Sequence, residues 1–217
     1  MPPEPPASDP RLLVMHALRL KGAADAATVA TATDLPGDEV AAQLDKLAGE
    51  GLAVERTGAL TGWSLTAAGR AEHLQALRRE VDDAGARATV TGAYERFRVL
   101  NAGVLDAVSR WQVRTERGRM VRNDHRDATY DARVVADLAR LGEQAAPLVD
   151  DLAGALARYR GYGPKLRDAV AHVEAGEGDW FARPVMPSFH TVWFELHEDL
   201  LATLGLERSD ESDEAAS

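Results

Sequence analysis

The sequence predicts a mainly α-helical protein, with a winged helix-turn-helix near its N-terminus and an all-α helical bundle or dimerisation domain after it. Three observations support this prediction. Apolar residues recur at helical spacing in three short segments that glycine or proline turns separate. Two short strand-like runs, LAVER and GWSL, follow the third segment. From Ala67 onward no convincing alternation of apolar and polar residues remains, so we expect only helices there.

Capping residues place the first two helices. Asp9 precedes a first-turn proline, and we expect a helix over Arg11–Lys21 that Gly22 ends. Asp25 is expected to cap a second short helix, AATVATAT. The Asp34-Leu35-Pro36-Gly37 turn that follows is typical of a helix-turn-helix.

The third helix is predicted from Asp38 to about Gly49. Its inward face has i, i+4, i+7 spacing: Val40, Leu44 and Leu47. Asp38 is expected to be the N-cap, and Glu39 to complement the helix dipole. Beyond the two strands, Thr66 is expected to cap a further helix, and Asp82-Asp83-Ala84-Gly85 is the expected hinge.

This ordered series resembles the winged helix-turn-helix of MarR-type bacterial regulators. Two motifs carry the resemblance: L-x-x-L-x-x-x-G-L, as Leu44, Leu47, Gly51 and Leu52, and L-T-x-x-G-R, as Leu65, Thr66, Gly69 and Arg70. The resemblance covers about Arg11–His73, a third of the chain. It implies that the third helix enters the major groove of double-stranded DNA and that the wing contacts the backbone or minor groove.

On that resemblance, the DNA-contacting candidates are Gln43, Lys46, Arg56 and Arg70. Gln43 could pair with adenine, and Lys46 could contact guanine or a phosphate. Asp38 and Glu39 would face the same polyanion and oppose its approach. Residues 11–83 carry eight basic and eleven acidic side chains, 8 − 11 = −3, so DNA binding and protein docking both stay open.

Further helices are expected over about Ala86–Arg114, Asp131–Ala157, Tyr162–Val173 and Pro187–Leu204. The first has a heptad-like stripe: Tyr94, Phe97, Asn101, Val104 with Leu105, Val108 and Trp111. This stripe suits a seam between two copies in a homodimer, with Asn101 fixing the register. The alternative is an ordinary amphipathic helix packed within its own domain.

Two cationic stretches, RTERGRMVRNDHR and RYRGYGPKLR, interrupt this acidic region. If they converge they could bind a small anionic ligand, such as a phosphorylated metabolite or coenzyme A. The alternative is two solvated basic loops. The candidate residues for an anionic or aromatic ligand are Arg114, Arg122, His125, Tyr130, Trp180, Trp193 and His197.

The segment Asp179–Gly205 collects aromatic residues and histidines. His190, Trp193 and His197 share one helical face, which is consistent with either a packed core or the lining of a pocket. His190 and His197 are two helical turns apart, about 10 Å along the axis, which is too far for both to bind one metal ion. The ending SFHTVWFELHEDLLATLG is similar to uncharacterised actinobacterial proteins found near, or appended to, enzymes related to pyruvate phosphate dikinase. That resemblance implies a metabolic context only.

Composition limits the functional classes. The chain has no cysteine, and its net charge of −10 argues against a surface that attracts nucleic acid everywhere. We find no G-x-S-x-G, phosphate loop or dinucleotide fingerprint, so we expect no enzyme, no cofactor and no metal. Without a secretory signal or a long apolar run, we expect a cytoplasmic protein with no membrane partner.

The expected organisation is a proline-rich leader over residues 1–9, a winged helix-turn-helix domain over 10–83, a helical domain over 84–206 and an acidic tail over 207–217. The first functional hypothesis is a DNA-binding transcriptional regulator whose helical domain dimerises and senses a ligand. The alternative is an interaction or ligand-binding protein that does not bind DNA and is associated with a metabolic enzyme.

Overall fold

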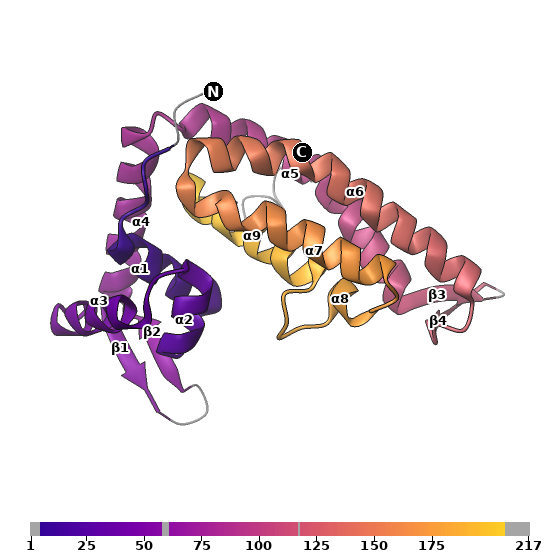
Figure 1. Cartoon of the computed structure of the whole chain (residues 1–217), viewed down its shortest axis with the longest axis horizontal. Helices are drawn as coiled ribbons and strands as arrows, with labels where there is room; N and C mark the ends of the chain where they lie inside the picture. The colour runs from indigo at the N-terminus through magenta and orange to yellow at the C-terminus, as the bar shows by residue number, and fades with distance from the viewer. Residues whose placement is uncertain (1–4, 58–60, 117, 207–217) are drawn as a thin grey trace. The chain divides into compact units, whose positions relative to one another are not determined.

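A computed structural model describes residues 5–57, 61–116 and 118–206 (Figure 1). The chain forms two compact units. Unit 1 comprises residues 1–88, 155–158 and 198–217, and unit 2 comprises residues 89–154 and 159–197. Unit 1 is therefore assembled from three separate parts of the sequence, and its C-terminal part includes the second half of the last helix.

Unit 1 begins with three helices and a β-hairpin, as predicted. Its elements are α1 (Pro10–Lys21), α2 (Ala26–Thr33), α3 (Gly37–Gly49), β1 (Ala53–Arg56), β2 (Gly62–Leu65) and α4 (Ala67–Asp83). Three expected caps are confirmed by side chains that accept backbone N–H bonds. Asp9 accepts from Arg11 at 2.9 Å, Asp25 accepts from Thr28 at 2.8 Å, and Thr66 accepts from Gly69 at 3.0 Å.

The hairpin gains a third backbone partner from the α1–α2 connection. β1 and β2 pair antiparallel from Ala53↔Leu65 to Arg56↔Gly62. Ala24 bridges to Trp63 with two N–H···O bonds of 3.0 and 2.7 Å. This close approach explains Gly62, because a Cβ there would lie 2.7 Å from the carbonyl carbon of Ala24. The order of elements and this pairing are winged-helix-like.

One apolar core cluster of unit 1 is formed by α1, α2, α3, the hairpin and Ala24 of the α1–α2 connection. Its most buried members are Val14, Val29, Val40 and Leu47. Trp63 packs against this core from β2, and Leu52 does so from the corner after α3. This cluster has no member from α4 or α9, whose buried Leu77, Val81 and Leu200 lie outside it.

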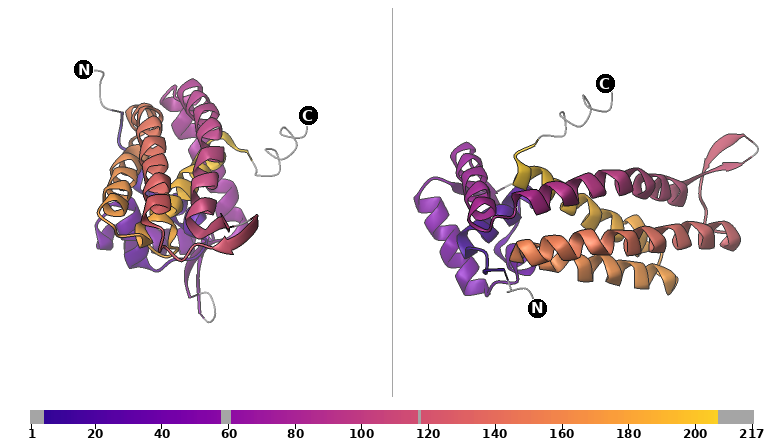
Figure 2. Two further views of the ribbon diagram at one scale, coloured as in Figure 1. Left: turned by 90° about the vertical axis from the view of Figure 1, so that its right-hand side faces the viewer. Right: turned by 90° about the horizontal axis from the view of Figure 1, so that it is seen from above.

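Unit 2 is built mainly from helices that run beside one another (Figure 2). It contains most of α5 (Arg87–Gln112) and α6 (Ala128–Ala155), all of α7 (Tyr162–Glu174) and α8 (Asp179–Ala182), and the first half of α9 (Phe189–Leu204). The 3-10 turn η1 (Ala157–Gly161) links α6 to α7. Both α6 and α9 end within unit 1. Among the described helices, none combines the length and the apolar character needed to cross a lipid bilayer.

The expectation of helices alone after Ala67 is wrong at one place. A hairpin of β3 (Val113–Glu116) and β4 (Arg119–Arg122) follows α5, and Figure 2 shows it at the end of α5 and α6. Gly118 has a φ of +79°, which a glycine adopts without strain in a tight turn. The strands are only four residues long, and arginines dilute their β-branched residues, so the sequence pattern was weak.

The stripe on α5 packs inside unit 2. Phe97 is fully buried and stacks on Trp193 of α9, with ring centroids 4.4 Å apart. The indole N–H of Trp193 donates to the side-chain oxygen of Asn101 at 2.9 Å. Asn101 therefore has its partner within the chain, as the interpretation of an ordinary amphipathic helix requires. The homodimer stays a prediction.

A matched pair of glycines tests the corner between α3 and α4. We expect Gly69→Ala to lower the free energy of unfolding by more than about 3 kcal/mol, because its Cβ would lie 1.9 Å from the carbonyl oxygen of Leu52. Gly49→Ala, also in a helix of unit 1, meets nothing within 4 Å and should stabilise by up to about 1 kcal/mol. Urea unfolding followed by circular dichroism measures both. Equal effects would contradict the packing described at Gly69.

Candidate functional site

The exposed face of α3 is the first candidate surface. Val40, Leu44 and Leu47 are at most 1% exposed, which fixes the rotation of the helix in unit 1. Asp45 and Lys46 are thereby exposed, and Gln43 is half-buried on the edge of that face. The sequence prediction placed both Gln43 and Lys46 outward; Lys46 is exposed and Gln43 is half-buried.

Asp38 does not cap α3, so that prediction is wrong. The helix begins at Gly37, its N-cap position is Pro36, and no side chain caps it. Pro36 has a φ of −56° and its carbonyl already accepts the first helical bond, from Val40 at 3.0 Å. This places Asp38 and Glu39 inside the first turn, where their charges complement the positive end of the helix dipole.

The charge of this face is negative. Asp38, Glu39 and Asp45 oppose Lys46, which gives 1 − 3 = −2 over Gly37–Gly49. Glu50 follows the helix and is neutralised by Arg11, with the two hydrogen-bonded at 3.0 Å. The face therefore repels a polyanion such as DNA and attracts a partner with a basic surface.

The two arginines predicted beside α3 are engaged within the chain. Arg56 is exposed on β1, and its Nε donates to Ser64 Oγ across the hairpin at 2.8 Å. Arg70 is exposed on α4, and its Nη1 donates to the Leu65 carbonyl at 3.0 Å. Each retains further N–H donors for a partner. The tip of this hairpin, residues 58–60, lies outside the described residues.

Comparisons of the chain with protein-family models, curated proteins and solved structures found no match.

Three ligand-binding candidates gather at the base of the β3–β4 hairpin in unit 2. Arg114 is 15% exposed and lies against Glu116, Asp124 and Asp127, at 3.4 Å from Asp124. His125 is 43% exposed, and its Nδ1 is 3.1 Å from Asp131 Oδ2. The hydroxyl of Tyr130 donates to the carbonyl of Arg110 at 3.0 Å. Arg122 is exposed on β4.

Buried Asn123 organises this hairpin base. Its side-chain amide donates to Asp131 at 2.8 Å and to the carbonyl of Trp111 at 3.1 Å, and its side-chain oxygen accepts from the backbone of His125 at 3.2 Å. The His125 ring lies 4.4 Å from that of Trp111. Arg114 and Tyr130 thus serve local structure, whereas His125 keeps an accessible ring.

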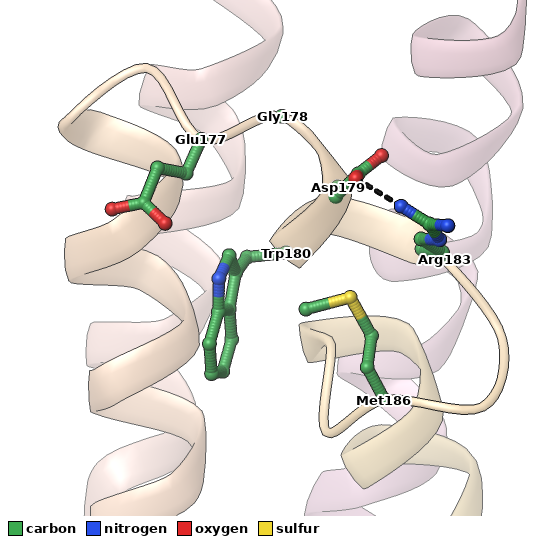
Figure 3. Close-up of a pocket in the computed structure, with 6 residues that line it drawn as sticks. All are labelled: Glu177, Gly178, Asp179, Trp180, Arg183 and Met186. Atoms are coloured by element: carbon green, nitrogen blue, oxygen red, sulfur yellow. Dashed lines mark hydrogen bonds and ion pairs between the residues drawn. The ribbon is translucent and has the colours of Figure 1, made fainter.

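The aromatic candidates do not share one pocket. Trp180 stacks on His172 at 4.0 Å and lines an open hollow of about 430 Å³ beside Glu177, Asp179, Arg183 and Met186 (Figure 3). Asp179 and Arg183, which are four residues apart, pair with each other on one side of the hollow. Trp193 and His197 are instead 2% and 8% exposed, and both pack on Phe97. Groups of three or more potential metal ligands are absent among the described residues.

The second cationic stretch does not offer Arg158 to a ligand. Its side chain is 2% exposed in unit 1 and pairs with Glu80 and Asp199. The interpretation of Arg158 as part of a solvated loop or an anion pocket is therefore wrong. Arg158, Glu80 and Asp199 form a buried polar cluster with two histidines, His16 and His73, which the sequence did not predict to be functional. Their only signal was a polar residue at a position that the apolar stripe of α1 or α4 predicts to be buried.

Removal of Asn123 tests the hairpin base. We expect Asn123→Ala to lower the free energy of unfolding by about 1–3 kcal/mol, because it leaves buried groups without hydrogen bonds. Arg126→Ala, at a nearby side chain that is 88% exposed, should change it by less than about 0.5 kcal/mol. Thermal and urea unfolding of the two variants provide the measurement. A change below 0.5 kcal/mol for Asn123→Ala would contradict the role of this residue.

Proposed function

We propose that this chain is a regulatory binding protein and that the exposed face of α3, with the β1–β2 hairpin, docks a protein partner with a basic surface. The observation that supports this most directly is the net charge of −2 on α3, where a DNA-reading helix would need cations. Winged helices serve both purposes, so the charge of the face decides between them.

The surface of α3 also favours close approach by a folded partner. Ala41 and Ala42 are exposed between Asp38 and Asp45, so small side chains separate the acids. A partner with lysines or arginines at matching positions would gain electrostatic complementarity, which raises specificity and the association rate. The similarity of the ending SFHTVWFELHEDLLATLG to proteins found with enzymes related to pyruvate phosphate dikinase suggests a metabolic enzyme as the first partner to test.

The second candidate is a MarR-like DNA-binding regulator. The order of elements in unit 1 favours it, together with the exposure of Lys46, Arg56 and Arg70 around α3. A homodimer of this kind would present two copies of α3 about 34–36 Å apart, at successive major grooves. The remaining donors of the two arginines would then contact phosphates.

Binding to random-sequence duplex DNA over a salt series separates the two candidates. For the docking protein we expect no measurable affinity at about 0.15 M salt, and a gain of affinity in the double variant Asp38→Lys and Asp45→Lys. Fluorescence anisotropy measures both. A steep loss of affinity with rising salt, with a slope that Lys46→Ala reduces by about one unit, would favour the DNA-binding regulator instead.

A ten-residue lysine peptide tests the attraction directly. Titration into the labelled protein should shift amide resonances of α3, and the same double variant should lose those shifts. Glu143→Lys with Asp150→Lys makes the same charge change on exposed positions of α6 and should retain them. Equal loss in both double variants would mean that only the total charge matters, which contradicts a docking face on α3.

A further inference from the structure

Unit 1 contains a buried cluster of charged and titratable side chains, which we call the latch cluster. It joins His16 of α1, His73 and Glu80 of α4, Arg158 of the Ala155–Arg158 segment, and Asp199 and Thr203 of α9. Asp199, Thr203 and His73 are at most 2% exposed, and His16 is 6% exposed. None of these groups belongs to the exposed face of α3 or to the β1–β2 hairpin.

Arg158 ties the two later parts of unit 1 to α4. Its Nε donates to Glu80 at 2.8 Å, its Nη2 donates to Thr203 at 2.6 Å, and its Nη1 donates to Asp199. Asp199 also accepts from Nε2 of His16 at 3.0 Å. Both the Ala155–Arg158 segment and the second half of α9 are thus held against α1 and α4 by buried polar bonds.

The two histidines limit how many protons the latch cluster accepts. Nδ1 of His16 lies 3.0 Å from Nε2 of His73. One of these two nitrogens must therefore carry a hydrogen and donate it, while the other accepts the hydrogen bond. Since Nε2 of His16 faces Asp199, the pair holds one shared proton whether His16 is neutral or charged. A further proton would set two N–H groups against each other, with Nη1 of Arg158 only 3.5 Å from His16.

The surroundings disfavour a charged His73. Burial, followed by the charges of His16 and Arg158, lowers the pKa of His73 to about 3; Asp199 opposes this and Arg19 adds to it. Burial also penalises the Asp199 carboxylate, but the charges of Arg158 and His16 outweigh it and hold the pKa of Asp199 well below its usual range. The closed latch thus keeps Asp199 charged and His73 neutral.

We propose that the latch cluster is an acid-released switch: a second proton on the His16–His73 pair frees the second half of α9 and the Ala155–Arg158 segment from α1 and α4. The His73 pKa is depressed in the closed state, so its contribution to closure is fully present above the ordinary value of 6.5. That contribution is lost progressively as pH falls from about 6.5 toward about 3.

We expect opening to be local because one apolar core cluster of unit 1 contains no member of the latch cluster. That core contains residues of α1, α2, α3 and the hairpin, and none from α9 or the Ala155–Arg158 segment. We therefore expect release to leave the winged-helix-like part folded and to let solvent reach residues of α9 that are buried in the closed state, Leu200 among them. Release of the latch cluster therefore changes which residues of unit 1 are exposed.

The absence of cysteine from the chain makes a direct test simple. Leu200→Cys places one thiol on the buried side of α9, and Leu44→Cys places one in the core on α3; both leucines are at most 1% exposed. Reactivity toward 4,4′-dithiodipyridine, divided by that of the urea-unfolded variant, is measured at pH 7.5 and 5.0. We expect a rise of roughly 30-fold for Leu200→Cys, because each pH unit below 6.5 adds about tenfold. Leu44→Cys should stay protected.

His73→Gln in the Leu200→Cys background keeps a hydrogen-bonding partner for His16 and removes the second protonation site. We expect it to flatten the pH dependence to less than about threefold. Unchanged reactivity of Leu200→Cys between the two pH values would overturn the proposal, as would parallel exposure of Leu44→Cys or a full pH response in His73→Gln. If a substituted chain does not fold at pH 7.5, amide hydrogen exchange of the unsubstituted chain, corrected for the intrinsic rate, decides by comparing α9 with α3.

Discussion

Asp199 is a carboxylate that is only 1% exposed, and it lies on α9 directly before the buried Leu200 and Leu201. A buried carboxylate is tolerated only where a cation and hydrogen-bond donors compensate for its lost hydration. Arg158 and His16 supply both, from a segment forty-one residues earlier and from the first helix. This requirement explains why unit 1 is completed by later parts of the chain. Apolar side chains could fill the same space but would not demand these particular partners.

The charged residues on the surface of unit 1, unlike Asp199, remain in contact with water. The charges on α3 are hydrated, so each contributes little to stability and is free to serve recognition. Arg11 and Glu50 differ from these residues, because they form a salt bridge with each other and so neutralise each other's charge. Asp38, Asp45 and Lys46 lie exposed on the same unit, and their balance decides which class of partner it attracts.

Local patterns predicted the parts of the fold that depend on neighbouring residues. The caps at Asp9, Asp25 and Thr66 were predictable because each side chain bonds within three residues of itself. The start of α3 was missed by one residue, since Pro36 and Gly37 begin the helix without a capping side chain. The β3–β4 hairpin was missed because short strands rich in arginine give a weak alternation.

The candidate site was less predictable, because it depends on contacts between distant residues. The exposure of Lys46 and the half-buried position of Gln43 follow from the apolar face of their own helix, whereas the hydrogen bond of Arg56 with Ser64 depends on the hairpin register. Arg158 lies in a cationic stretch that is typical of a solvated loop. Only the fold brings Glu80 and Asp199 to it, seventy-eight and forty-one residues away. No pattern within a helix encodes such a meeting.

The sequence separation within unit 1 also sets an order of assembly. The α1–β2 core joins residues that all lie within the first 65 positions, so its loops close at low entropic cost. The contact of Arg158 with His16 closes a loop of 142 residues. During synthesis, the winged-helix-like core is complete long before its polar partners leave the ribosome. Unit 1 is therefore finished last, although its N-terminal helices are made first.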